Sequence, residues 1–92
     1  NKIYLDHDFT TDIITFCYSS EIKNIDGEII ISVDDAQINS RKFKVSFYEE
    51  IARLVIHGVL HLLGFDDQLI NDKKIMKRIE NKLLSNFKFI LL

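Results

Sequence analysis

The residues whose types could do chemistry gather in HGVLHLLGFDD, residues 57–67. His57 and His61 are four residues apart, so on a helix their side chains project from one face with Cβ atoms about 5–6 Å apart, a spacing that lets two imidazoles bind one metal ion. Gly64 is the residue type expected just past a helix end. Asp67, three residues further on, can then turn back as a third ligand. Three protein ligands leave one coordination position open, which is typical of a catalytic metal site.

The alternative is that both histidines are hydrogen-bonded core residues. Burying two imidazoles on an apolar helix without strong partners costs about 1–3 kcal/mol each. Two of the three histidines in the chain have this spacing, and we therefore predict a metal site held by His57, His61 and Asp67. Asp66 is a weaker alternative ligand and a candidate general base, and its other interpretation is a solvated turn residue. The spacing itself identifies no catalytic residue.

The residue after the first histidine bears on the kind of hydrolase. Zinc peptidases carry the pattern HExxH, in which the glutamate next to the first histidine is the general base. Here that position is Gly58. A metal-dependent peptidase of HxxxHxxGxxD type is therefore kept as an alternative and not as the first interpretation.

The histidine pair lies on the clearest predicted element, a helix over residues 47–63. Ser46 and Glu49 form a capping box, which predicts that the helix begins at about Phe47. From Ile51 onward the helix is apolar on nearly every side, and a helix of this kind is buried. We expect it to be the central helix around which the domain packs.

Two short strands are predicted before this helix, over residues 12–18 and 28–33, because both stretches are rich in β-branched residues. The consecutive isoleucines of the second stretch suggest burial on both faces of the sheet. The fold class is therefore α+β: a small β-sheet packed against a buried central helix that carries the HxxxH motif.

Two further helices are predicted. A short one covers residues 36–42 and is capped by Asp34 or Asp35. The last covers residues 69–86 with apolar residues on one stripe. Its cations could follow RNA phosphates, but a solvated face is the preferred interpretation because Asp72 and Glu80 are interspersed among Lys73, Lys74, Lys77, Arg78 and Lys82.

Composition limits the classes of protein that fit. A chain of 92 residues with 47% hydrophobic and 28% charged residues forms one modest globular core. The formal net charge of −2 argues against a strongly basic nucleic-acid binder. Cys17 is the only cysteine, which excludes a disulfide scaffold and suits a cytoplasmic location. The longest nearly apolar run, residues 54–63, is shorter than the roughly 20 residues of a membrane span, so no membrane partner is expected.

Three ordered segments resemble the YbeY family, endoribonucleases of ribosomal RNA maturation. HGVLHLLGFDD is similar to the family signature HGxLHLxGYDH, with Phe65 in the place of tyrosine. DHDFTTDIITF, residues 6–16, is similar to the family segment that ends in TDVLSFP. GEIIISVDDA, residues 27–36, resembles the family's GDIxIS strand, and SFYEEIARLVIHG also matches the approach to the first histidine.

The resemblance implies a metal-dependent, single-strand-specific endoribonuclease that trims ribosomal RNA, notably the 3′ end of the small-subunit RNA, and contributes to ribosome quality control. It implies one Zn²⁺ per chain, with single-stranded rRNA and ribosomal particles as partners. Metal binding carries over directly to His57 and His61. Residues 1–92 would then be a single YbeY-like metal-hydrolase domain, lacking the helix and strand that usually precede this region in the family.

Two positions depart from the family pattern. The third ligand of the family is a histidine, whereas this chain has Asp67. A carboxylate is an acceptable zinc ligand, but two histidines and one carboxylate also suit Fe²⁺ or Mn²⁺. An arginine implicated in family activity normally follows the tyrosine that aligns with Tyr4, and here that residue is Leu5. This second departure favours the remaining alternative, a non-catalytic ribosome-associated factor.

Overall fold

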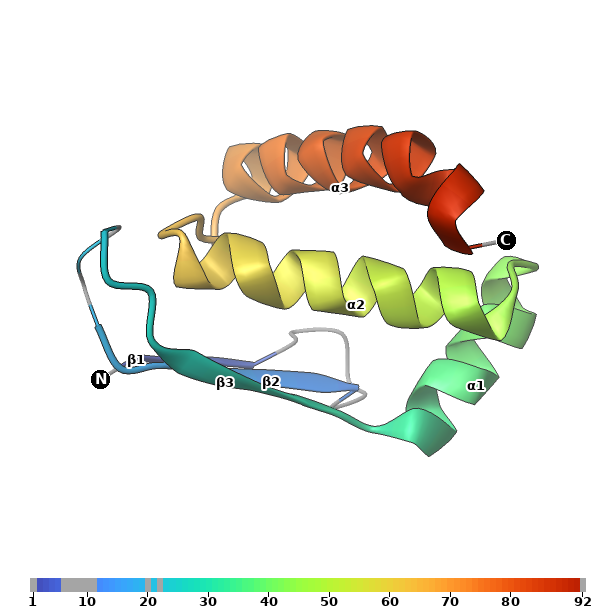
Figure 1. The fold of residues 1–92 in the computed structure, drawn as a ribbon, viewed down its shortest axis with the longest axis horizontal. Helices are drawn as coiled ribbons and strands as arrows, with labels where there is room; N and C mark the ends of the chain where they lie inside the picture. The colour runs from blue at the N-terminus through green and yellow to red at the C-terminus, as the bar shows by residue number, and fades with distance from the viewer. Residues whose placement is uncertain (1, 6–11, 20, 22, 92) are drawn as a thin grey trace.

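The computed structural model describes residues 2–5, 12–19, 21 and 23–91 (Figure 1). Within them, β1 (Lys2–Leu5), β2 (Ile13–Cys17) and β3 (Gly27–Ile31) form an antiparallel sheet in the order β1-β2-β3. The helices that follow are α1 (Val33–Phe43), α2 (Phe47–Leu62) and α3 (Ile70–Leu91). The α+β prediction is confirmed. β1 was not predicted, and part of segment 6–16 lies outside the described residues.

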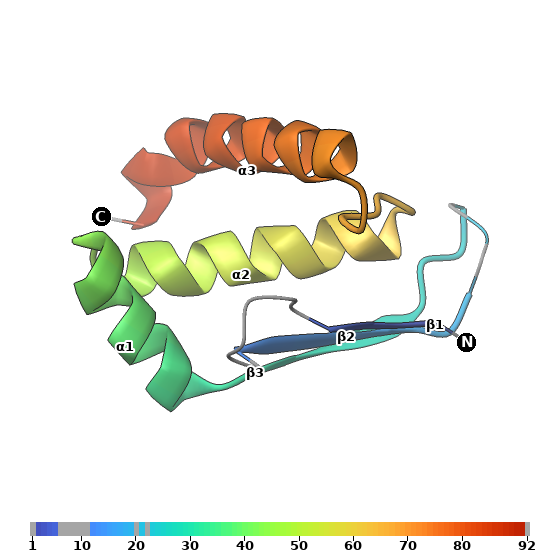
Figure 2. The ribbon, with the colours of Figure 1, turned by 180° about the vertical axis from the view of Figure 1, so that it is seen from behind.

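The molecule has three layers, with α2 between the sheet and α3 (Figures 1 and 2). α2 contacts β2 and β3 on one side and α3 on the other, while α1 contacts it near its beginning. The predicted central position of this helix is therefore confirmed. The expected burial of the helix on every side is wrong, because Val55 and Val59 are 41% and 40% exposed. A helix between two layers keeps open flanks, and its apolar sequence does not reveal which side is open.

The two faces of the sheet differ in cover. Ile13 and its partly buried neighbour Ile29 pack with Ala36 and Leu54 in the core between the sheet, α1 and α2. On the strands, alternate residues point the other way, and Ile30 is 51% exposed. The expected burial of the second strand on both faces is therefore wrong for the described residues, in which helices cover one face.

The ends of α2 follow the sequence signals. Oγ of Ser46 accepts a hydrogen bond from the Glu49 amide at 3.0 Å, so the helix begins at Phe47 as predicted. At the other end Gly64 has φ +101°, its N–H donates to the carbonyl of His61, and the next N–H donates to that of Leu60. This pair of bonds is a Schellman motif. It ends the helix and reverses the chain toward the histidine pair.

The bounds of α1 and α3 differ from the predicted ones. α1 begins at Val33, and Oγ of Ser32 caps it by accepting from the Asp35 amide at 3.3 Å. The prediction that Asp34 or Asp35 is the cap is wrong, because both lie in the first turn, where acidic side chains favour the helix dipole. α3 extends to Leu91, beyond the predicted end at residue 86.

Gly58 marks the closest approach of α2 to the sheet. A Cβ at this position would lie 2.8 and 2.9 Å from Cδ1 and Cγ1 of Ile29 on β3. The position therefore faces the sheet and has no room for a side chain. The absence of a side chain here allows α2 to lie directly on β3.

We expect Gly58→Ala to destabilise the protein by up to about 2 kcal/mol. Overpacking costs about 1–3 kcal/mol, and the better helix propensity of alanine returns about 1 kcal/mol. Urea unfolding of Gly58→Ala, Ile29→Ala and the double variant measures the coupling. The alanine at 58 should cost little once the Ile29 side chain is gone. Additive effects of the two substitutions would contradict the close approach.

Candidate metal centre

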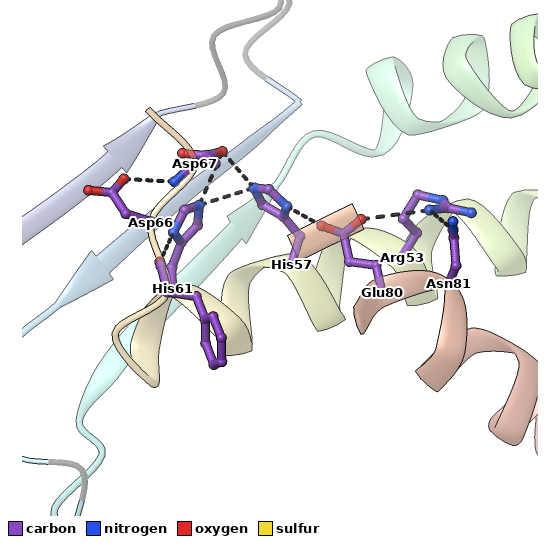
Figure 3. A network of polar contacts seen from close by, with 8 residues as sticks. Arg53, His57, His61, Asp66, Asp67, Glu80 and Asn81 are labelled. Atoms are coloured by element: carbon purple, nitrogen blue, oxygen red, sulfur yellow. Dashed lines mark hydrogen bonds and ion pairs between the residues drawn. The ribbon is translucent and has the colours of Figure 1, made fainter. Parts of the chain in front are cut away.

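The three predicted ligands lie together where α2 ends (Figure 3). Nε2 of His57 lies 3.0 Å from Nε2 of His61 and 3.3 Å from Oδ2 of Asp67. The distance from Nε2 of His61 to the same oxygen is 3.5 Å. Successive turns of α2 present the imidazoles, and the loop after Gly64 brings the carboxylate back to them.

These separations fit a tetrahedral metal site. With metal–ligand distances of about 2.0–2.2 Å, two ligand atoms of a tetrahedron lie about 3.3–3.6 Å apart. The three distances of 3.0, 3.3 and 3.5 Å among His57, His61 and Asp67 are close to that range. The donor set of two imidazoles and one carboxylate is one that Zn²⁺, Fe²⁺ and Mn²⁺ accept.

The other ring nitrogen of each histidine has an acceptor. Nδ1 of His57 lies 2.7 Å from Oε2 of Glu80, and Nδ1 of His61 lies 2.9 Å from the carbonyl oxygen of Phe65. Carbonyls and ionised carboxylates only accept hydrogen bonds, so in each neutral imidazole the hydrogen is assigned to Nδ1. Both Nε2 lone pairs then point toward the Asp67 carboxylate. The three atoms are therefore arranged so that one metal ion could bind all of them.

His61 is the more deeply buried of the pair. Its side chain is 2% exposed, and its ring stacks on Tyr4 of β1 with centroids 4.0 Å apart. Burial lowers the pKa of His61 below its ordinary value of 6.5; nearby His57 adds to this, while the Phe65 carbonyl and the Asp67 and Asp66 carboxylates oppose it. The lowered pKa keeps the imidazole neutral, and therefore able to bind a metal, across neutral pH.

Sequence reasoning missed the residue that faces His57 from α3. Glu80 is 5% exposed, and its Oε1 lies 3.6 Å from Nη1 of Arg53 on α2. The sequence interpretation placed Glu80 on the solvated face of the helix, among the lysines. Its carboxylate instead faces inward and does not neutralise their charge on the outer side of α3. One signal was present: Arg53 precedes His57 by four residues, and a charged residue on a largely apolar helix calls for a partner of opposite charge.

Asp66 does not join the cluster. Its Oδ1 accepts a hydrogen bond from the Asp67 amide at 2.8 Å, and its Oδ2 lies 3.6 Å from Nζ of Lys2. The Asp67 amide and, to a lesser degree, Lys2 lower the pKa of Asp66. The turn-residue interpretation therefore fits Asp66 better than the ligand one, and its lowered pKa makes it a weaker general base.

Fold and cluster first define a class: an α+β protein whose central helix presents an HxxxH pair to a carboxylate of the following loop. The family model described as Endoribonuclease YbeY matches residues 1–88 of the chain. The chain belongs to the YbeY endoribonuclease family, and the resemblance noted in its sequence is confirmed.

Curated proteins named Endoribonuclease YbeY are similar to most of the chain. The protein of Azobacteroides pseudotrichonymphae is 47% identical over 88 residues, which cover 96% of this chain and 63% of the relative. That of Chlorobium chlorochromatii is 47% identical over 96% of the chain and 56% of the relative. That of Bacteroides fragilis is 42% identical over 92% of the chain and 60% of the relative. The chain thus spans 56–63% of the length of these relatives.

No solved structure matches the chain. Among the described residues, no helix combines the length and the apolar character that crossing a membrane requires.

The metal-free protein should lose stability as the pH falls. Unfolded His61 takes up a proton below its ordinary pKa of 6.5, whereas the folded residue does so only at lower pH. Between these two pH values the unfolded state binds more protons, so acid favours unfolding. Thermal unfolding in a chelator should show Tm decreasing from pH 7 to pH 5, with a smaller decrease for His61→Gln. A Tm that rises over this range would contradict the neutral, buried imidazole.

Proposed function

We propose that this domain is a metal-dependent endoribonuclease that cleaves single-stranded ribosomal RNA during maturation of the small-subunit 3′ end. The observation that carries the proposal is the convergence of His57, His61 and Asp67 within 3.5 Å, in a chain of the YbeY endoribonuclease family. We further propose that residues 1–92 act as one metal-hydrolase domain, in the cytoplasm, on ribosomal particles, and with a part in ribosome quality control.

The three side chains would hold one ion, and Zn²⁺ is the first candidate. When bound, such an ion activates water and polarises a phosphoryl oxygen of the RNA. Asp67 in the cluster and Glu80 beside it supply two carboxylates, against one guanidinium from Arg53. This excess of negative charge favours a divalent cation. The carboxylate ligand also leaves Fe²⁺ and Mn²⁺ as candidates.

Position 5 lacks the family arginine, and β1 offers another cation. Tyr4 faces His61, so its neighbour Leu5, which is 50% exposed, points to the opposite side of the strand. Lys2 shares the side of Tyr4, with Nζ 4.8 Å from its ring centroid and 3.6 Å from Asp66. We propose that Lys2 contacts an RNA phosphate beside the metal site.

The packing of Gly58 argues against the peptidase alternative. A zinc peptidase needs a glutamate at this position as its general base. In this chain the position is filled by Ile29, which lies 2.8 Å from where a Cβ would be. The site therefore has no carboxylate in the place that peptidase chemistry uses.

The direct test is metal content together with RNA cleavage. We expect about one Zn²⁺ per untagged chain by elemental mass spectrometry, and cleavage of single-stranded RNA that a chelator abolishes. His57→Ala and Asp67→Ala should lose both the metal and the cleavage. Asp66→Asn, a neighbouring carboxylate outside the cluster, should keep its metal.

Other outcomes would point to the alternatives. Metal-free protein that resists loading with Zn²⁺, Fe²⁺ or Mn²⁺ would overturn the metal centre. Ribosome co-sedimentation that survives His57→Ala, with no cleavage by the parent protein, would favour a non-catalytic ribosome-associated factor. Metal-dependent cleavage of unfolded protein but not of RNA would identify a peptidase.

Asp67→His should change the metal preference. The variant replaces an anionic oxygen by a neutral nitrogen and creates a three-histidine site, which favours Zn²⁺ relative to Mn²⁺. Competition titrations with both ions should show the Zn²⁺/Mn²⁺ affinity ratio rising at least tenfold in the variant (about 1.4 kcal/mol). An unchanged ratio would mean that Asp67 does not bind the ion.

A further inference from the structure

Glu80 occupies an unusual position for a carboxylate on a lysine-rich helix. It lies in α3, 23 residues from His57 in sequence, yet its Oε2 is 2.7 Å from Nδ1 of that histidine (Figure 3). Its side chain is 6% exposed. Burying a carboxylate is costly unless hydrogen bonds and an opposite charge compensate for it. The contacts of Glu80 should therefore account for its burial.

Arg53 provides the opposite charge. Nη1 of Arg53 lies 3.6 Å from Oε1 of Glu80 and donates to Oδ1 of Asn81 at 3.0 Å. The guanidinium is thus held by two neighbouring residues of α3. It faces one carboxylate oxygen of Glu80 and leaves the other for His57. A carboxylate accepts hydrogen bonds and donates none, so the second oxygen of Glu80 is an acceptor for the His57 ring.

An acceptor at Nδ1 determines what His57 can do at Nε2. A neutral imidazole carries one hydrogen, and an acceptor at one nitrogen places that hydrogen there, leaving a lone pair on the other. For His61 the acceptor is a backbone carbonyl, that of Phe65. For His57 it is a side chain, so substitution can remove it without altering α2.

We propose that Glu80 is the positioning residue of His57: it holds the hydrogen on Nδ1, so that the Nε2 lone pair faces His61 and Asp67, and thereby makes α3 part of the metal centre. The consequence for metal affinity rests on the metal binding proposed above. The consequence for the imidazole does not, because the Nδ1 hydrogen is present in the metal-free protein. Partners of this kind typically change metal affinity 10–100-fold.

The first measurement is long-range ¹H–¹⁵N NMR of the metal-free full chain at neutral pH. The parent protein should show the hydrogen of His57 on Nδ1. In Glu80→Ala the ring should shift toward the Nε2–H form, because its acceptor is gone. In Glu80→Gln the side chain has the same length and retains a carbonyl acceptor, so the shift should be smaller. This graded response is not expected of a carboxylate with a merely structural role.

The second measurement is Zn²⁺ affinity by competition with a chromophoric chelator. Glu80→Ala should bind 10–100-fold more weakly than the parent, with Glu80→Gln between the two. Glu50→Gln is the matched control, because it alters a carboxylate on α2 that is also buried, 2% exposed, and lies seven residues before His57. It should leave both the imidazole and the affinity unchanged. Circular dichroism checks that each variant folds, and near-isosteric Glu80→Gln keeps the test available if the alanine variant does not.

The outcomes separate this inference from the proposed function. A parent protein whose His57 carries its hydrogen on Nε2 would overturn the role of Glu80, as would a Glu80→Ala variant with unchanged imidazole signals and Zn²⁺ affinity within twofold of the parent. A parent that binds no metal but shows the hydrogen on Nδ1, lost in Glu80→Ala, would overturn the proposed function and leave the positioning of His57 supported.

Discussion

Two imidazole nitrogens and a carboxylate oxygen converge within 3.5 Å where α2 ends, and their mutual repulsion is the constraint on which the site depends. His61 and Asp67 are 2% and 7% exposed, so water screens that repulsion poorly. A metal ion bound among the three atoms would relieve it. At Nδ1 each imidazole faces a hydrogen-bond acceptor: the Glu80 carboxylate for His57 and the Phe65 carbonyl for His61. An acceptor at Nδ1 keeps the ring hydrogen there and leaves the Nε2 lone pair available to bind a metal ion.

The central position of α2 allows one helix to support the site from two sides. Gly58 lets the helix lie directly on β3, and His61 stacks on Tyr4 of β1, at the other end of the strand order. Arg53 and His57 face the opposite layer, where α3 supplies Glu80. The two histidines thus share a metal-ligand spacing but depend on different parts of the fold for their orientation.

Asp67, the third proposed ligand, is the residue at which this chain departs from the motif that its sequence otherwise resembles, HGxLHLxGYDH. Asp67 brings a negative charge close to that of Glu80, and Arg53 compensates only one of the two. A neutral imidazole in the same position would leave the site less negative. The electrostatics of the centre, and not only its geometry, therefore follow from this one residue.

The sequence by itself determined the features that depend on local geometry: the His57–His61 spacing, the start of α2 after Ser46 and its end at Gly64. In a helix each backbone hydrogen bond joins residues four apart, so the spacing of side chains on one face and the ends of the helix depend on residues close in sequence. Only the tertiary structure decided which faces of α2 are covered, that β1 places Tyr4 on His61, and that Glu80 points inward. These contacts join residues far apart in sequence. Their pairing depends on how the layers pack, which local periodicity does not encode.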